Sequence, residues 1–226
     1  DLVPLDDDLR ELFKSWFNPG FLKLAKITWE TKAAVLEKIM KYERVHEIKD
    51  MDELKRRLGE DRRFFSYFHP ALEDEPIIFV QVALTNGLGK SIQEITKPRS
   101  DGDQKYDSAT FYSISNCQEG LSRVTLGNFL IKRVVFEIQE ELPNIKHFGT
   151  LSPIPGFRDW FSYLEDVKIK NILGEVPIDN ISFLKSSDLK VGDPRIVANK
   201  VAITKLVAHY LMNEKNHKQL PINDVC

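Results

Sequence analysis

The sequence predicts a chain of the α+β or α/β class, in which a mixed sheet is flanked by helices and preceded by a helical segment. Apolar residues recur at helical spacing through residues 1–61, whereas strand-like apolar runs begin at Arg62. From there, strand-like and helix-like segments alternate along the chain. With 226 residues, of which 42% are hydrophobic, the chain can bury a substantial core.

Three helices are expected before Arg62. Residues 6–17, "DDDLRELFKSWF", combine an acidic first turn with an apolar face, and "NPG" ends that helix. Residues 28–46 repeat the pattern with Thr31 as a candidate N-cap, and residues 50–58 follow with Asp50 as N-cap. The change of pattern predicts a boundary between residues 1–61 and residues 62–226.

The second part is expected to contain four strands and several helices. The strands are predicted at residues 62–69, 76–84, 108–115 and 146–152. Helices are predicted at residues 91–95, 125–142 and 194–215, with further short ones after Phe157. The apolar face of the helix at 125–142 is expected to comprise Leu126, Phe129, Leu130, Val134, Ile138 and Leu142. Residues 97–105, "KPRSDGDQK", predict a mobile polar loop.

Composition argues against several classes of protein. A net charge of −2 gives no reason to expect a nucleic-acid partner. No apolar run approaches the roughly 18–20 residues that span a bilayer. Cys117 and Cys226 make neither a disulfide framework nor a metal cluster, and the five scattered histidines predict no structural metal. The chain does not begin with Met, so we expect it to be a segment of a longer product.

The loop "NCQEGLSRV", residues 116–124, is a candidate anion site. It joins a predicted strand to the N-terminus of a predicted helix, where backbone N–H groups and the helix dipole favour negative charge. Gly120 and Gly127 would allow a ligand to approach the backbone, and Arg123 would add a positive charge. An ordinary strand-to-helix turn is the alternative, because two glycines are a weak signal.

The stretch "GTLSPIPGF", residues 149–157, is a candidate catalytic loop. Ser152 ends a predicted strand, and Pro153 and Pro155 fix two φ angles directly after it. Such a loop holds the serine hydroxyl at a set position beside the preceding anion loop. The alternative is a rigid turn that only caps the next helix. No G-x-S-x-G motif is present, so the pattern does not indicate a hydrolase.

These two stretches together resemble the malonyl-CoA decarboxylase family. The similarity lies in "FYSISNCQEGLSRVTLGNFLIKRVV" followed by "LPNIKHFGTLSPIPGF", and it extends to "VHEIKDMDELKRRLG" and "PIIFVQVALTNGLGKSIQEI". The resemblance implies that residues 1–61 are the end of a helical oligomerisation domain. Residues 62–226 would be a catalytic domain of the GNAT (acetyltransferase) fold, incomplete at its C-terminus.

The resemblance also implies site residues. Ser152 matches the catalytic serine of the family. The loop at residues 116–124, here called the glycine loop, matches the acyl-CoA site together with the start of the helix that follows it. The residues expected to bind substrate are Ser113, Ser122, Arg123, Val124, Thr125, Leu126, Gly127 and Asn128. The family often carries a glutamate at the position of Thr125. Its catalytic histidine lies in a motif expected after Cys226, so the role is not transferred to His147, His209 or His217.

The implied activity is decarboxylation of malonyl-CoA to acetyl-CoA and carbon dioxide in fatty acid metabolism. The thioester itself delocalises the negative charge, so no cofactor is expected, and the remaining tasks are to stabilise an enolate and protonate it. The alternatives are an inactive acyl-CoA-binding or oligomerisation fragment, and an acetyltransferase that shares only the fold. The family forms homotetramers and works in mitochondria, peroxisomes and cytosol.

Overall fold

The computed structural model describes residues 3–96, 105–121, 124, 126–176, 181–186, 189 and 193–215. The chain forms two compact units, Asp1–Ser152 and Pro153–Cys226. Most of the predicted polar loop at 97–105 lies outside the described residues. Among the described residues, no helix is both long and apolar enough to cross a membrane.

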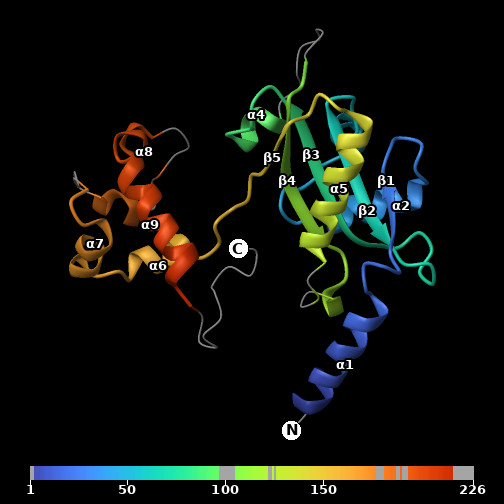
Figure 1. Ribbon diagram of the computed structural model, residues 1–226, viewed down its shortest axis with the longest axis horizontal. Coiled ribbons are helices and arrows are strands. Elements are labelled where there is room, and N and C mark those ends of the chain that lie inside the picture. The colour runs from blue at the N-terminus through green and yellow to red at the C-terminus, as the bar shows by residue number, and fades with distance from the viewer. Residues whose placement is uncertain are drawn as a thin grey trace. The chain divides into compact units, whose positions relative to one another are not determined.

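The first unit is built on a five-stranded mixed sheet (Figure 1). Its strands lie in chain order, β1 to β5; neighbours from β1 to β4 are antiparallel, and β5 is parallel to β4. The strands are β1 (Lys23–Lys26), β2 (Arg62–Phe68), β3 (Pro76–Thr85), β4 (Ser108–Asn116) and β5 (His147–Thr150). Every residue of β3 is buried, as its continuous apolar run predicts for a central strand.

Helices cover both faces of this sheet. One face packs through Val80, Val82 and Leu84 of β3 against α5 (Gly127–Glu141). The opposite face packs through Phe64 and Phe79 against α2 (Ala33–Tyr42) and α3 (Met51–Arg57). Because side chains alternate along a strand, Phe79 and its neighbour Val80 in β3 face different layers of helices. The short helix α4 (Ile92–Thr96) follows β3.

Several predicted details of the first unit need correction. The strand β1 lies in residues 1–61, which were expected to contain only helices, and it pairs with β2. The helix α2 begins at Ala33 with no side-chain cap, because the Thr31 hydroxyl accepts a hydrogen bond from the Thr28 N–H instead. Asp50 does cap α3, through the Glu53 N–H at 2.7 Å. Phe129 is 53% exposed and does not share the buried face of α5.

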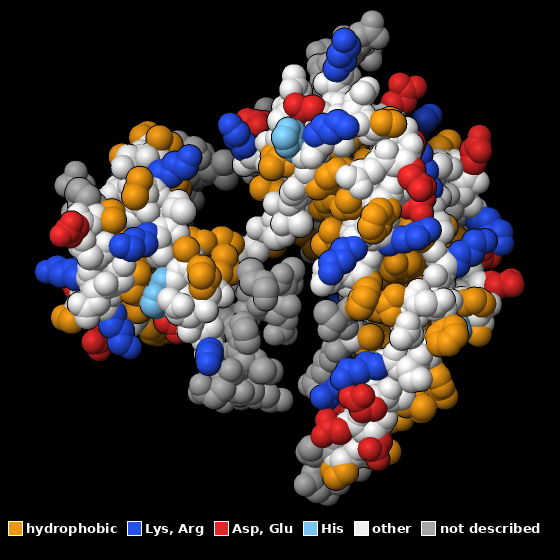
Figure 2. All heavy atoms as spheres, in the orientation of Figure 1, with side chains coloured by type: hydrophobic (Ala, Val, Ile, Leu, Met, Phe, Trp, Pro, Cys, Tyr) orange, Lys and Arg blue, Asp and Glu red, His pale blue; other side chains and the backbone are white. Residues whose placement is uncertain are grey.

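The boundary predicted near Arg62 does not separate compact units. Residues before it supply β1, α2 and α3 to the sheet unit, which extends to Ser152. The helix α1 (Val3–Trp16) precedes them, and Figure 2 shows hydrophobic side chains gathered along it. The exposed apolar residues of α1 are Leu5, Leu9, Leu12 and Trp16.

The second unit is helical and has its own core. Phe161, Leu173 and Leu206 are among the buried residues of that core. The predicted long helix at 194–215 is two helices, because the chain breaks at Asn199. The helical elements of this unit are α6 (Phe157–Ser162), α7 (Asp166–Leu173), the short 3-10 helix η2 (Ile181–Lys185), α8 (Pro194–Ala198) and α9 (Lys200–Asn213).

Candidate active site

Ser152 directly follows Leu151, the last residue after β5 whose backbone is hydrogen-bonded to β4. The Leu151 N–H donates to the carbonyl oxygen of Phe111 in β4 at 2.8 Å, and the chain then leaves the sheet. The Ser152 side chain is exposed, and its hydroxyl has no hydrogen-bond partner within the described part of the chain. A fixed backbone and a free hydroxyl are what a donor to a bound ligand requires.

The pairing between strands β4 and β5 ends two residues before Ser152. Their pairing ends at Phe111 and Thr150, whereas β4 continues to Asn116. Beyond Phe111, the edge of β4 therefore has no β5 beside it. Leu151 packs against a small buried cluster formed by Ala83, Ile95 and Tyr112. The serine is thus anchored on β4 at the place where the two strands separate.

The loop after Ser152 ends at a position that requires glycine. Gly156 has φ of +74° and forms the N-cap of α6. A Cβ at this position would lie 2.7 Å from the Tyr210 hydroxyl oxygen. That same hydroxyl donates to the Pro155 carbonyl at 2.7 Å. The far end of the proline loop is therefore fixed by α9, as the two prolines predict for a rigid segment.

The glycine loop leads into α5 as predicted. It contains the 3-10 turn η1 (Glu119–Leu121), and α5 begins at Gly127, beside Ile78 and Ile114 of the sheet. Val124 and Leu126 are buried in the core on the α5 face, so their side chains are not available to a ligand. Asn128 is exposed. Ser122, Arg123 and Thr125 lie outside the described residues.

Ser113 is not brought together with the glycine loop. Its hydroxyl is buried and donates to Glu43 Oε2 at 2.7 Å, in a cluster that includes Gln81 of β3. That cluster lies on the α2 and α3 face of the sheet, whereas Val124, Leu126 and α5 lie on the other. Ser113 can thus contribute to the site through the backbone of β4.

Glu43 is a buried carboxylate that the sequence analysis missed. Besides Ser113, it accepts hydrogen bonds from the Ser115 hydroxyl at 3.1 Å and from the Val45 and His46 N–H groups at 2.8 and 2.9 Å. It also accepts from the side-chain amide of Gln81. Gln81 inside the apolar run "PIIFVQVAL" is the one signal that could have indicated a buried polar cluster.

Two of the three histidines to which no catalytic role was transferred lie within the described residues. His147 is exposed at the start of β5. His209 stacks on Trp160 with a centroid distance of 6.2 Å, and its Nε2 lies 3.5 Å from Glu214 Oε1. His217 lies outside the described residues. Among the described residues, no group of three His, Cys, Asp or Glu could hold a metal ion.

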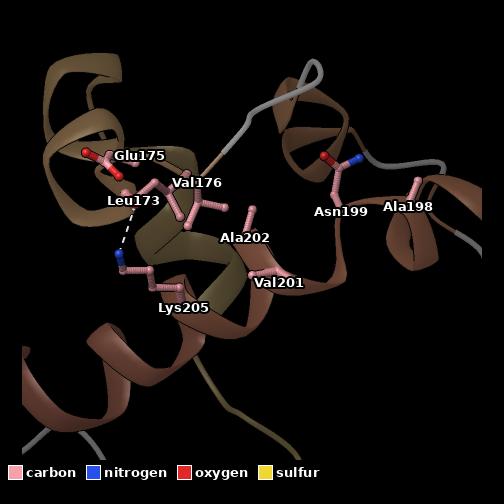
Figure 3. Close-up of a pocket in the computed structure, with 8 residues that line it drawn as sticks. All are labelled: Leu173, Glu175, Val176, Ala198, Asn199, Val201, Ala202 and Lys205. Carbon is pink, nitrogen blue, oxygen red and sulfur yellow. Dashed lines mark hydrogen bonds between the residues drawn. The ribbon is translucent and has the colours of Figure 1, made fainter.

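An open pocket of about 640 Å³ lies in the helical unit (Figure 3). Within it, Lys205 Nζ donates to the Leu173 carbonyl at 2.9 Å, at the C-terminal end of α7. The pocket is lined by Leu173, Glu175, Val176, Ala198, Asn199, Val201, Ala202 and Lys205. None of the residues predicted for the site is among them, and its only described cation is committed to a backbone carbonyl.

Sequence comparison places most of the chain in one family. A family model described as the malonyl-CoA decarboxylase C-terminal domain matches residues 20–226. The mitochondrial malonyl-CoA decarboxylase of Anser anser anser is 36% identical, over 96% of this chain and 47% of that protein. The rat enzyme is also 36% identical, over 96% of this chain and 48% of its own. The chain spans about half the length of the curated relatives that it matches.

Solved structures give the same result. The crystal structure of malonyl-CoA decarboxylase from Rhodopseudomonas palustris matches with a TM-score of 0.79 and 41% identity, covering 99% of this chain and 55% of that one. The enzyme from Cupriavidus metallidurans matches with a TM-score of 0.78 and 37% identity, covering 99% and 56%. These matches confirm the predicted mixed sheet flanked by helices. The chain therefore belongs to the malonyl-CoA decarboxylase family.

Proposed function

We propose that the protein containing this chain decarboxylates malonyl-CoA to acetyl-CoA and carbon dioxide, with Ser152 as a catalytic residue. The observation that supports this most is the position of Ser152. Its hydroxyl is exposed and unpartnered within the described structure, one residue after Leu151 is bonded to β4. It lies within the 207-residue span, residues 20–226, that matches the family.

The proposed reaction breaks the bond between the carboxylate carbon and the α-carbon. The electron pair of that bond passes to the α-carbon and is shared with the thioester oxygen as an enolate, while carbon dioxide leaves. A hydroxyl donor held against the thioester oxygen lowers the barrier by stabilising this developing charge. Proton transfer to the α-carbon then completes acetyl-CoA. By resemblance, the proton donor is a histidine in the family motif expected after residue 226.

We further propose that the CoA moiety binds at the start of α5. Residues 122–128 would place backbone N–H groups, the positive end of a 15-residue helix and the Arg123 side chain near the pyrophosphate. Exposed Asn128 is available to the ligand, and Gly127 allows the backbone to approach it. Ser113 would support the substrate through β4, because its hydroxyl is committed to Glu43.

The cellular setting is proposed from the relatives. Two curated relatives carry "mitochondrial" in their names, and we propose the same compartment for this protein. Peroxisomal and cytosolic forms, a role in fatty acid metabolism and a homotetrameric assembly are proposals of the same kind. The partners would be malonyl-CoA and acetyl-CoA.

The test is the Ser152→Ala variant of the whole protein, assayed for carbon dioxide release from malonyl-CoA. Loss of the donor should lower kcat by about 100-fold or more. Ser162→Ala is a matched control, because Ser162 is exposed and only donates to the Asp159 carbonyl within α6. Wild-type turnover by Ser152→Ala would contradict the assignment. Binding of malonyl-CoA without turnover in the wild-type protein would favour the acyl-CoA-binding alternative.

A further inference from the structure

Tyr112 is the one residue of β4 that has no partner strand on either side within the described sheet. The pairing with β3 passes from Gln81↔Ser113 to Val82↔Phe111, so Tyr112 is the extra residue of a β-bulge. The pairing with β5 ends one residue earlier, at Phe111. Tyr112 is 2% exposed, and a buried carbonyl outside the ladder requires another donor.

Two side chains hold this bulged residue. His46 Nε2 lies 3.1 Å from the Tyr112 carbonyl oxygen, and the Tyr112 hydroxyl donates to Gln81 Oε1 at 2.9 Å. A carbonyl can only accept, so Nε2 is the nitrogen of His46 that carries hydrogen. Burial raises the pKa of Tyr112 to about 12, which keeps its hydroxyl protonated as a donor.

His46 is itself held by two buried charged side chains. The Glu43 carboxylate accepts from the N–H groups of Val45 and His46, and the Arg57 guanidinium donates to the carbonyls of His46 and Glu47 at 2.7 and 2.8 Å. Glu43 is 5% exposed and Arg57 is 3% exposed. The short connection between α2 and α3 is thus fixed from both sides. It presents the His46 imidazole to β4.

The bulged residue is also next to the candidate catalytic loop. Leu151 packs on the cluster that contains Tyr112, and its N–H donates to the residue before Tyr112. Ser152 follows Leu151 directly. A displacement of Tyr112 would therefore also displace the backbone that carries Ser152.

We propose that His46 is a positioning residue for Ser152, acting by its hydrogen bond to the bulged carbonyl of Tyr112. The inference rests on the proposed role of Ser152. It assigns to the α2–α3 connection, whose Arg44 also pairs with Glu119 of the glycine loop at 3.2 Å, the task of fixing the position of Ser152. Small displacements of a reacting group reduce rates strongly, so the effect should fall on kcat.

The test compares His46→Leu with His46→Gln in the whole protein. Leucine keeps the volume but removes the donor, and we expect kcat for malonyl-CoA to fall about 10-fold or more with little change in KM. Glutamine can donate from its amide to the same carbonyl and should recover most of the rate. His147→Leu is the matched control, because His147 is exposed. Wild-type kcat in His46→Leu, or a glutamine variant as slow as the leucine variant, would overturn the proposal.

A measurement on the wild-type protein keeps the proposal independent of variant folding and of turnover. Nitrogen NMR of the histidine side chains at neutral pH should show His46 with hydrogen on Nε2. A hydrogen on Nδ1 alone would exclude the bond to Tyr112 and overturn the proposal. If this signature is present but the wild-type protein releases no carbon dioxide from malonyl-CoA, then the proposed function fails and the contact of His46 stands.

Discussion

Single residues fix the two ends of the candidate catalytic loop, residues 149–157. At its start, one backbone hydrogen bond from Leu151 holds the chain on β4, and at its end Gly156 adopts φ of +74° against the Tyr210 hydroxyl. A left-handed backbone is unfavourable for residues with a Cβ, and here the Cβ would also meet an oxygen at 2.7 Å. The conformation of the loop therefore depends on Gly156 as well as on its two prolines.

Replacement of Gly156 by alanine should destabilise the protein. We expect a loss of about 1–3 kcal/mol in the free energy of unfolding, since both backbone strain and the contact with Tyr210 oppose the change. Chemical denaturation of the whole protein measures it. Gly120→Ala is the control, because a Cβ there meets no atom within 4 Å, and it should change stability by less than about 0.5 kcal/mol. Equal losses would contradict the role given to Gly156.

Asp107 should make stability depend on pH in the acidic range. Its carboxylate accepts from the Ser108 hydroxyl at 2.6 Å and from the Gly87 N–H at 2.7 Å, and these bonds hold its pKa below the usual value. A lowered native pKa means that the stabilisation is present above about pH 4 and is lost as the pH falls through the native pKa.

Thermal unfolding of Asp107→Asn across pH 7 to pH 3 checks this. The variant should melt below the wild type at pH 7, and the difference should shrink toward pH 3. Glu37→Gln, an exposed carboxylate in the middle of α2, should show no such trend. A difference in melting temperature that stays constant with pH would show that the charge of Asp107 is not responsible.

At this scale, local patterns in the sequence predicted some residues and not others. Asp50 was recognisable as a cap because its partner, the Glu53 N–H, is three residues away. Thr31 was wrong as a cap because its hydroxyl has a competing local partner, the Thr28 N–H. The partner of Ser113 is Glu43, separated from it by 70 residues, and only the folded sheet brings them together.

Among the elements, α5 connects the core of the sheet to the glycine loop, where CoA is proposed to bind. Leu130, Val134 and Ile138 are buried at helical spacing against β3 and β2, and the helix begins at Gly127. Phe129 is next to Leu130 in sequence but lies largely in solvent. The buried face of α5 is therefore narrower than the apolar pattern predicts.

The variants Leu130→Ala and Phe129→Ala test that face. Leu130 is fully buried, and its truncation should lower the free energy of unfolding by about 2–5 kcal/mol. Phe129→Ala should lower it by no more than about 1 kcal/mol, because the side chain is already 53% exposed. Denaturant melts of the whole protein measure both. A larger loss for Phe129 would mean that this residue is covered in the assembled protein.

Elements with a long apolar pattern were predictable from the sequence, whereas the edge strand β1 was not. The run "PIIFVQVAL" and the helix at 125–142 both form as predicted, because burial on both faces or on one face leaves a clear pattern. The strand β1 has only four residues, with a lysine at each end. It is a strand because it pairs with β2 some forty residues later, from Lys23↔Phe68 to Lys26↔Phe65.

For the whole molecule, the main result is two units with separate cores. The buried clusters of the sheet unit contain no residue after Leu151, and the buried cluster of the helical unit begins at Phe157, within the described residues. The sequence predicted a boundary near Arg62 from a change of pattern. The structure divides after Ser152, because packing on a shared sheet outweighs the difference between helical and strand-rich segments.

Separate cores should unfold separately. Leu206 is fully buried in the helical unit, and Leu206→Ala should weaken that unit by about 2–5 kcal/mol. Hydrogen exchange of the whole protein should then become faster in α6, α7 and α9, while β3 and β4 keep their protection. A uniform acceleration across both units would show that they unfold as one cooperative body.

The strand order also has a consequence for synthesis on the ribosome. The strands β1 to β4 are neighbours in the chain and pair antiparallel, whereas β5 joins only after the crossover through α5. All the residues of these four strands, with Tyr112 of the bulge and His46, are therefore synthesised before Ser152. The Ser152 hydroxyl is therefore added to the chain after the strands that position it.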